Sequence, residues 1–209
     1  MPMNQPDWDE KHRASAEDPP AEPATIVREL LPILPAGPVL DLACGTGRHA
    51  LLMAANHHVV SAIDFSGVAL DLLQQRALPR RLSTSRLCNF PRPGTARGER
   101  ILTLQANLDQ VELPQDYFAV VICIQYLQRS LFSSIQKTLR SGGILVFETF
   151  TRAQMDLQGG PKNPAYLLET GELRTAFSAL STLFYRELRA EQAIASLVAQ
   201  KPRRKSGRP

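Results

Sequence analysis

The segment VLDLACGTGRHA, residues 39–50, has residue types and spacing that could bind an adenosine cofactor. Its second half, GTGRHA at residues 45–50, fits the G-x-G-x-x-G/A pattern, in which glycines let backbone N–H groups approach a pyrophosphate. Asp64 follows at about the distance expected of a carboxylate that accepts hydrogen bonds from ribose hydroxyls. These letters alone leave open whether the loop binds NAD, another adenosine cofactor or nothing.

The elements around this loop predict a strand–helix–strand unit. Residues 38–43 form a short apolar strand, residues 48–56 have helical spacing, and residues 59–64 form a second strand that ends on Asp64. Ser66 suits the N-cap of a following helix that runs to residue 78. A right-handed crossover makes the two strands parallel, and ligands of such sheets bind beyond the carboxyl ends of the strands.

The rest of the chain predicts further alternation and a different ending. A helix from residue 25 precedes the first strand, and Gly142-Gly143 suit the C-cap of a helix at 131–139. The remaining predicted strands are 101–106, 118–125, 144–150, 181–188 and 193–201, with a short helix at 172–180. The last two strands are too close for a crossover helix and must pair antiparallel. The predicted fold class is α/β: a Rossmann-like, mostly parallel seven-stranded sheet with helices on both faces and a C-terminal antiparallel hairpin strand.

The 209 residues suit a single domain, and the composition indicates where it is basic. We expect a flexible segment at 1–24, the domain at 25–200 with an inserted basic loop at 79–98, and a basic tail at 201–209. The formal charge is only +4, yet residues 76–100 carry seven arginines against the single acid Glu99. The longest apolar run, 118–124, is too short to span a bilayer, and no signal-peptide pattern is visible. Three scattered cysteines favour a reducing, cytoplasmic location without a metal site.

A known family matches these motifs. DLACGTG, residues 41–47, resembles the first motif of class I S-adenosylmethionine-dependent methyltransferases. The resemblance extends to Asp64, QANL at 105–108, LRSGGILVFETF at 139–150 and the terminal hairpin, and is strongest to a small bacterial tellurite-resistance-type subgroup. It implies S-adenosyl-L-methionine as the cofactor and a small molecule as the methyl acceptor. The hairpin also argues against a dehydrogenase, whose second half would continue with parallel strands.

The resemblance implies a cofactor site at the first two strand ends. Asp41 would attract the cofactor ammonium, Gly45 and Gly47 would let the loop pass beneath it, and Asp64 would accept from the ribose hydroxyls. Phe65 would cover one face of the adenine. The other members of the implied site are Ala43, Cys44, Asn107 and Leu108. Asn107 stands where the family usually has an acid, and Ala43 replaces the first glycine. We expect a negative φ at Ala43, as at an ordinary strand end.

Methyl transfer needs no obligatory catalytic side chain, because the leaving thioether needs no proton. Tyr126 and Glu148 are candidates for the substrate pocket, where either could act as a base; the alternatives are core packing for Tyr126 and a partnered structural acid for Glu148. Trp8 is either a lid over the cofactor or a surface anchor. Two other functions stay open: an RNA methyltransferase that uses the basic loop and tail, and a cofactor binder without turnover.

Overall fold

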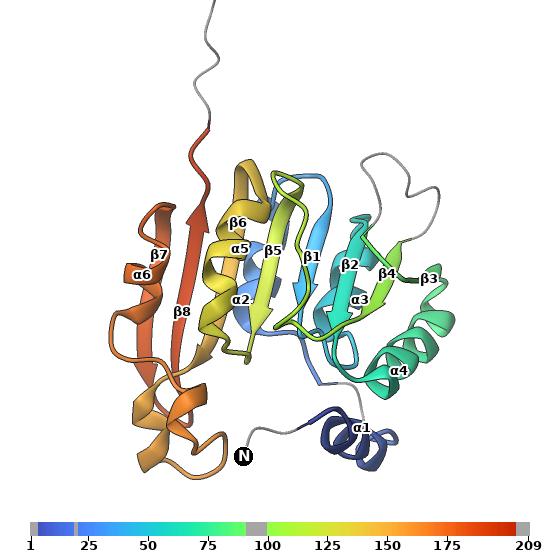
Figure 1. The fold of residues 1–209 in the computed structure, drawn as a ribbon, viewed down its shortest axis with the longest axis horizontal. Helices are drawn as coiled ribbons and strands as arrows, with labels where there is room; N and C mark the ends of the chain where they lie inside the picture. Colours follow the sequence, from blue (N-terminus) through green and yellow to red (C-terminus); the bar gives the residue numbers. More distant parts are fainter. Residues whose placement is uncertain (1–3, 19–20, 91–99, 204–209) are drawn as a thin grey trace, which may run out of the picture. The chain divides into compact units, whose positions relative to one another are not determined.

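A computed structural model of the chain describes residues 4–18, 21–90 and 100–203. It divides into two compact parts, residues 1–112 and 113–209, which are coloured blue to green and green to red in Figure 1. Residues 91–98 of the expected basic loop and residues 204–209 of the expected tail lie outside the described residues.

The first part contains four parallel strands in the order β3-β4-β2-β1. Their bounds are β1 Val39–Leu42, β2 Val60–Asp64, β3 Thr84–Leu87 and β4 Ile101–Gln105. All residues of β1 and β2 are buried, as expected of short apolar runs in a parallel sheet. Two helices, α3 (Arg48–Ala55) and α4 (Gly67–Ala77), follow β1 and β2 and form the predicted crossovers.

The described residues contain eight strands rather than the seven predicted. The additional strand, β3, lies inside the segment expected to be an inserted loop, and it pairs in parallel with β4 at the sheet edge. Its residues are half-buried or exposed and carry no apolar periodicity. Backbone hydrogen bonds to β4, rather than burial of side chains, therefore hold this strand in place, and its sequence gives no signal of it.

Two further helices precede β1. Helix α1 (Gln5–Ala14) begins with a capping box, because Asn4 accepts from the Asp7 N–H and the Asp7 side chain accepts from the Asn4 N–H. Pro6 occupies the first turn, where its missing N–H costs nothing. The short helix α2 (Thr25–Leu30) continues into a 3₁₀ turn at Leu31–Ile33. A helix thus lies within the segment 1–24, for which the sequence predicts only a flexible or loosely docked chain.

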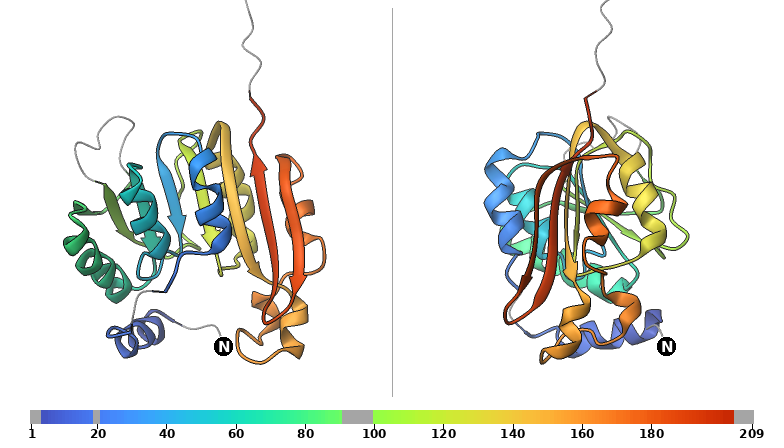
Figure 2. Two further views of the ribbon diagram at one scale, coloured as in Figure 1. Left: turned by 180° about the vertical axis from the view of Figure 1, so that it is seen from behind. Right: turned by 90° about the vertical axis from the view of Figure 1, so that its left-hand side faces the viewer.

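The second part contains strands in the order β5-β6-β8-β7. β5 (Phe118–Ile124) and β6 (Leu139–Phe150) are parallel, while β8 (Ala193–Gln200) is antiparallel to both β6 and β7 (Ser181–Arg189). Helices α5 (Phe132–Thr138) and α6 (Glu172–Ala176) lie on one face of these strands (Figure 2). The predicted fold class is confirmed: the fold is α/β, mostly parallel and Rossmann-like, and it ends in the antiparallel hairpin.

An aromatic cluster holds α5 and α6 to the second set of strands. Phe132 of α5 lies 6.0 Å from Phe147 of β6 and 5.1 Å from Phe177, measured between ring centroids. Phe177 follows α6 and lies 5.7 Å from Phe147. Phe147 and Phe177 are fully buried, so the three rings form the contact between helices and strands on this face.

The interpretation of Gly142-Gly143 as a helix C-cap is wrong. Helix α5 ends at Thr138, and both glycines belong to β6, where the pairing with β5 is irregular between Phe118 and Val120. A Cβ on Gly143 would lie 2.9 Å from the carbonyl oxygens of Arg140 and Phe118, so this strand can pass only without a side chain there.

The remaining helical turns are short and of the 3₁₀ type: Leu78–Arg80, Arg129–Leu131, Arg152–Asp156 and Pro164–Tyr166. Among the described residues, no helix has both the length and the apolar character needed to cross a bilayer. The same residues contain no group of three or more His, Cys, Asp or Glu side chains that could hold a metal ion.

Candidate functional site

The glycine loop connects β1 to α3, and its two glycines differ in what surrounds them. Both have positive φ, 53° at Gly45 and 84° at Gly47. A Cβ on Gly47 would lie 2.3 Å from the side chain of Leu73 in α4, so this glycine is required by packing as well as by its backbone conformation. A Cβ on Gly45 would meet only His12, at 3.8 Å, among the described residues. The backbone at Gly45 is therefore the more accessible surface of the loop.

Ala43 corrects one expectation. Its φ is 52°, in the left-handed region, and not negative as predicted. Ala43 lies where the chain changes direction as it leaves β1: Cys44 N still donates to Ile63 O of β2 at 2.9 Å, and a turn closed by Gly47 N and Cys44 O, at 3.0 Å, follows directly. A methyl group in this conformation costs about 1 to 2 kcal/mol, which a glycine would avoid. The alanine is therefore accommodated with backbone strain.

Asp41 and His49 form a buried pair under the loop. The Asp41 carboxyl group is 1% exposed, its Oδ1 lies 3.9 Å from Nδ1 of His49, and its Oδ2 has no hydrogen-bond partner among the described residues. Burial raises the pKa of Asp41 to about 7, although a hydrogen bond from the Ala50 N–H and the charge of Arg48 oppose the shift. Burial likewise lowers the pKa of His49 to about 3, so the imidazole is neutral, and its Nε2 accepts from Ala24 N. The site thus contains one costly, unsatisfied acid oxygen.

Asp64 ties the loop to the end of β2. Its Oδ2 accepts from Gly45 N at 2.7 Å, and its Oδ1 accepts from Ser66 N at 2.9 Å. Burial is the main cause that raises its pKa, against these backbone hydrogen bonds. Ser66, not Asp64, caps α4, since its hydroxyl accepts from Ala69 N at 3.1 Å. Each Asp64 oxygen keeps a further lone pair for a ligand hydroxyl.

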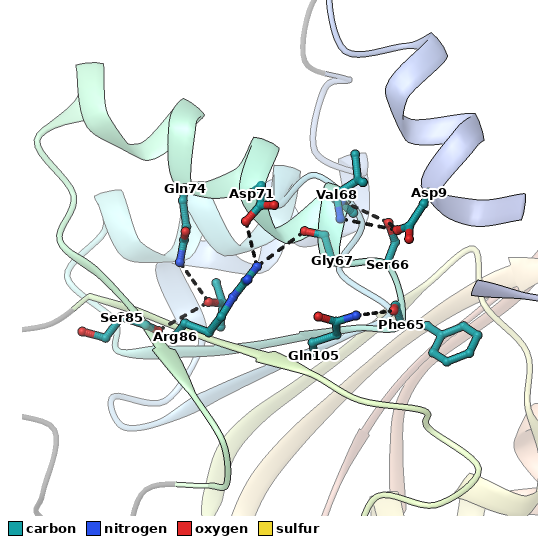
Figure 3. Close-up of polar contacts among 12 residues, drawn as sticks. Asp9, Phe65, Ser66, Gly67, Val68, Asp71, Gln74, Ser85, Arg86 and Gln105 are labelled. Carbon is teal, nitrogen blue, oxygen red and sulfur yellow. Dashed lines mark hydrogen bonds and ion pairs between the residues drawn. The ribbon is translucent and has the colours of Figure 1, made fainter. Parts of the chain in front are cut away.

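The residues implied for the adenine lie at the ends of β2 and β4. Ala106 N donates to Asp64 O at 3.0 Å, which places the segment 106–108 beside Phe65. The Phe65 ring is half-buried and points away from the polar cluster of α4 and β3 in Figure 3. The Asn107 carbonyl oxygen Oδ1 already accepts from Asp109 N at 3.0 Å, so only its second lone pair could receive the adenine amino group. Leu108 is 5% exposed and forms an apolar support.

Cys44 behaves as a small buried side chain. It is 6% exposed, and burial together with the charges of Asp64 and Asp41 raises the pKa of its thiol well above the usual value. A thiol in such surroundings is a poor nucleophile. This environment favours the reading of Cys44 as a space-filling member of the loop.

Helix α1 brings residues to this site that sequence reasoning missed. Asp9 Oδ1 accepts from Ser66 Oγ at 2.5 Å and from Val68 N at 3.4 Å, as Figure 3 shows. His12 lies beside Gly45, and Asp64 acts electrostatically on it. The N-x-x-D capping box at residues 4–7 was the available signal for this helix. Nothing in the sequence indicates which side of the helix faces the loop.

Tyr126 and Glu148 lie in the second part of the chain, near the ends of paired strands. Gln125 N donates to Glu148 O at 2.7 Å, which brings the two strand ends together. The Glu148 carboxylate accepts from Ser196 Oγ at 2.6 Å and lies 3.9 Å from the Arg186 guanidinium. The Tyr126 hydroxyl donates to Gln128. The contacts of Glu148 are those of a partnered acid, in a polar row that crosses β6, β8 and β7.

Comparisons with known proteins give a consistent result. Residues 40–147 match the family described as a methyltransferase domain. The malonyl-[acyl-carrier protein] O-methyltransferase of Paenibacillus sp. (strain JDR-2) is 27% identical over 179 residues, which cover 80% of this chain and 58% of that protein. The chain spans about half the length of the curated relatives it matches, 58% and 42% for two of them.

Solved structures show the same fold. The crystal structure of TehB from Haemophilus influenzae has a TM-score of 0.70 at 16% identity and covers 93% of this chain and 67% of its own. The N-methyltransferase NodS from Bradyrhizobium japonicum WM9 has a TM-score of 0.62 at 15% identity, over 93% of this chain and 97% of its own.

Proposed function

The chain belongs to the family of methyltransferase domains, and we propose that it transfers a methyl group from S-adenosyl-L-methionine to a small-molecule acceptor. The observation that supports this proposal most directly is the unpartnered Oδ2 of Asp41, buried at the end of β1 beside the glycine loop. An ammonium group is the partner that such an oxygen lacks, and the cofactor has one. The residues present therefore fit the cofactor.

The proposed roles follow from the contacts. Asp41 attracts the ammonium group, directly or through water, and the N-terminus of α3 can receive the carboxylate, because Gly47 provides no side-chain cap there. Asp64 accepts from the ribose hydroxyls, and Phe65 with residues 106–108 encloses the adenine. Ala43, Cys44, Gly45 and Gly47 shape the loop beneath the methionine part.

When bound, the cofactor would supply a methyl group activated by a sulfonium, and its transfer to the acceptor would release a neutral thioether that needs no proton. The protein's part is to position the acceptor and to exclude water. We assign Tyr126 to the acceptor pocket, because it follows the buried strand β5. Glu148 takes a structural role in this proposal, since its carboxylate is engaged by Ser196.

A small acceptor is favoured over RNA, because several arginines of the basic segment are engaged by other groups of the chain. Arg86 pairs with Asp71 at 2.8 Å, Arg100 donates to His57 O at 3.0 Å, and Arg80 donates to Arg76 O at 2.6 Å. Side chains already held within the chain are less available to phosphates. The proposal includes the cytoplasmic location expected from the cysteine content, and within the described residues Cys44, Cys88 and Cys123 form no disulfide.

Calorimetric titration of the full chain with S-adenosylmethionine, S-adenosylhomocysteine and NAD tests the proposal. The first two should bind and NAD should not. Asp64→Ala should weaken binding by ~1 to 3 kcal/mol, the usual loss for hydrogen bonds to a charged group. Asp71→Ala is the matched control, because Asp71 is an exposed acid of α4 that pairs only with Arg86 among the described residues. Binding of NAD without S-adenosylmethionine would contradict the assignment, and cofactor binding without methylation of any acceptor would favour a binder that lacks turnover.

A further inference from the structure

The inward face of helix α1 is mostly polar, and Trp8 is its one large aromatic side chain. No residue of α1 is buried, and its half-buried residues recur at helical spacing on one side: Gln5, Trp8, Asp9 and His12. A helix without an apolar stripe gains little from the hydrophobic effect and is held mainly by its polar contacts. Such a helix opens locally at low cost.

The strongest polar contact of this face is made by Asp9. Its carboxylate accepts from the hydroxyl of Ser66 and from the Val68 N–H, and the hydrogen bond to Ser66 lowers the pKa of Asp9. Asp9 therefore adds an acceptor from another helix to the N-terminus of α4, where Ser66 is already the N-cap. This contact fixes α1 over the segment that connects Asp64 to α4.

One turn further along α1, His12 is placed against the glycine loop. Its Cε1 lies 3.8 Å from the position of a Gly45 Cβ, and its ring lies 6.0 Å from the Trp8 ring, centroid to centroid. Partial burial lowers the pKa of His12, against the charge of Asp64, and the cations Lys11 and Arg76 act in the same direction as burial. Figure 1 shows α1 beyond the arrowheads of β1 and β2, the strand ends that carry Asp41 and Asp64.

The chain that follows α1 is also tied to the loop. Arg76 of α4 donates to the Thr46 hydroxyl and to Asp18 O, the latter at 3.4 Å, and Arg48 donates to Glu22 O at 3.4 Å. These contacts hold Asp18 and Glu22 at the loop independently of Asp9. Release of Asp9 would thus free α1 while the chain after it stays anchored.

We propose that α1 is a detachable cover of the cofactor site and that Asp9 is the positioning residue that docks it, by holding His12 and Trp8 over Gly45 and Asp64. This inference rests on the proposed function, because the cofactor is what α1 would cover. Asp9 touches neither the cofactor nor the acceptor in this proposal; it acts through Ser66 and the position of α1.

The test uses the full chain and its only tryptophan, Trp8, which lies on α1 and reports directly on docking. S-adenosylhomocysteine is titrated by calorimetry into the wild type, Asp9→Ala and Asp9→Asn, and acrylamide quenching of Trp8 is measured with and without this ligand. Glu10→Ala is the matched control, because Glu10 is the neighbouring acid, its side chain is 76% exposed, and it pairs only with Arg13 among the described residues.

In the wild type and in Glu10→Ala, the ligand should protect Trp8 from quenching and bind with equal affinity. Asp9→Ala should weaken binding roughly tenfold, the equivalent of about one hydrogen bond to a charged group, and leave Trp8 exposed to acrylamide. Asp9→Asn keeps an acceptor for Ser66 and should recover part of the affinity. The melting temperature of the free protein should change little, because α1 buries no residue.

Two results would overturn the cover while leaving the proposed function intact. One is that Asp9→Ala binds S-adenosylhomocysteine as tightly as the wild type does, and that acrylamide quenches its Trp8 to the same extent. The other is tighter binding by Asp9→Ala, which would make α1 an obstruction of the site. Failure of the wild type to bind S-adenosylhomocysteine or S-adenosylmethionine would instead overturn the proposed function, and the cover with it.

Discussion

Replacement of Asp41 by asparagine tests the electrostatic cost that the site carries without cofactor. Burial raises the pKa of Asp41 from 3.8 to about 7 in the folded protein. Because this folded value lies above the unfolded one, ionisation opposes folding, and the penalty grows as the pH rises from about 4 to 7. A rise of the pKa from 3.8 to about 7 corresponds to roughly 4 kcal/mol above pH 7, and to less than half of that at pH 5. The free energy of unfolding of Asp41→Asn, relative to wild type, should therefore rise by about 2 to 3 kcal/mol between pH 5 and pH 8.

The measurement is urea unfolding of both proteins at the two pH values, without cofactor. The change between pH values is the useful quantity, because the amide also loses or gains hydrogen bonds that do not depend on pH. Shifts of other groups, such as His49, are common to both proteins and cancel. Asp71→Asn is the control, since Asp71 is 57% exposed and should give no such pH dependence. An equal effect of Asp41→Asn at pH 5 and pH 8 would refute the reasoning. The same variant should bind S-adenosylmethionine more weakly at pH 8, because it lacks the carboxylate that pairs with the ammonium group of the cofactor.

Two backbone positions of the glycine loop give further predictions. Ala43→Gly should raise the free energy of unfolding by roughly 0.5 to 1 kcal/mol. Glycine removes the strain that Cβ causes at a φ of 52°, and this gain exceeds the extra conformational entropy that glycine loses on folding. Ala69→Gly, inside helix α4, should lower it by about 1 kcal/mol under the same urea assay, and a loss in both variants would argue against strain at Ala43. Gly47→Ala should cost about 2 to 4 kcal/mol through the contact with Leu73 and the φ of 84°. When Leu73 is also alanine, Gly47→Ala should cost less, because the clash with Leu73 is gone and only the backbone strain remains. Thermal and urea unfolding measure this cost, and a cost of zero would show that the backbone conformation contributes nothing.

The parts of the fold that the sequence predicted are those stabilised by buried side chains. β1, β2 and β5 are short apolar runs that are buried along their whole length, so the pattern of residue types reflects the force that holds them. β3 was missed for the converse reason, because its stability comes from backbone pairing at an edge. Gly142 and Gly143 were misread because a glycine pair suits both a helix end and an irregular strand, and only the neighbouring strand decides between them.

At the candidate site, the sequence predicted which residues lie at the strand ends but not how they are held. Ala43 has its positive φ directly before the turn at Cys44 and Gly47, where the chain leaves β1, and propensity at one position cannot indicate it. The contact between Asp9 and Ser66 joins residues 57 positions apart, so no local pattern contains it. The same holds for Glu148, whose partner Ser196 is 48 residues away. Long-range hydrogen bonds depend on topology, which periodicity alone does not specify.

The two features that the site leaves unsatisfied lead to one consequence for stability. Asp41 is buried with an oxygen that lacks a partner, and α1 docks through a polar face that buries no residue. Cofactor binding would supply an ammonium to the first and a contact surface to the second. A ligand stabilises a protein through its preference for the folded state, and here that preference includes relief of a cost the free protein already carries. Without cofactor at pH 8, Asp41→Asn should melt at a higher temperature than the wild type. This difference should narrow or reverse when S-adenosylmethionine is added, because the Asp41 carboxylate then pairs with the ammonium group and stabilises the folded protein.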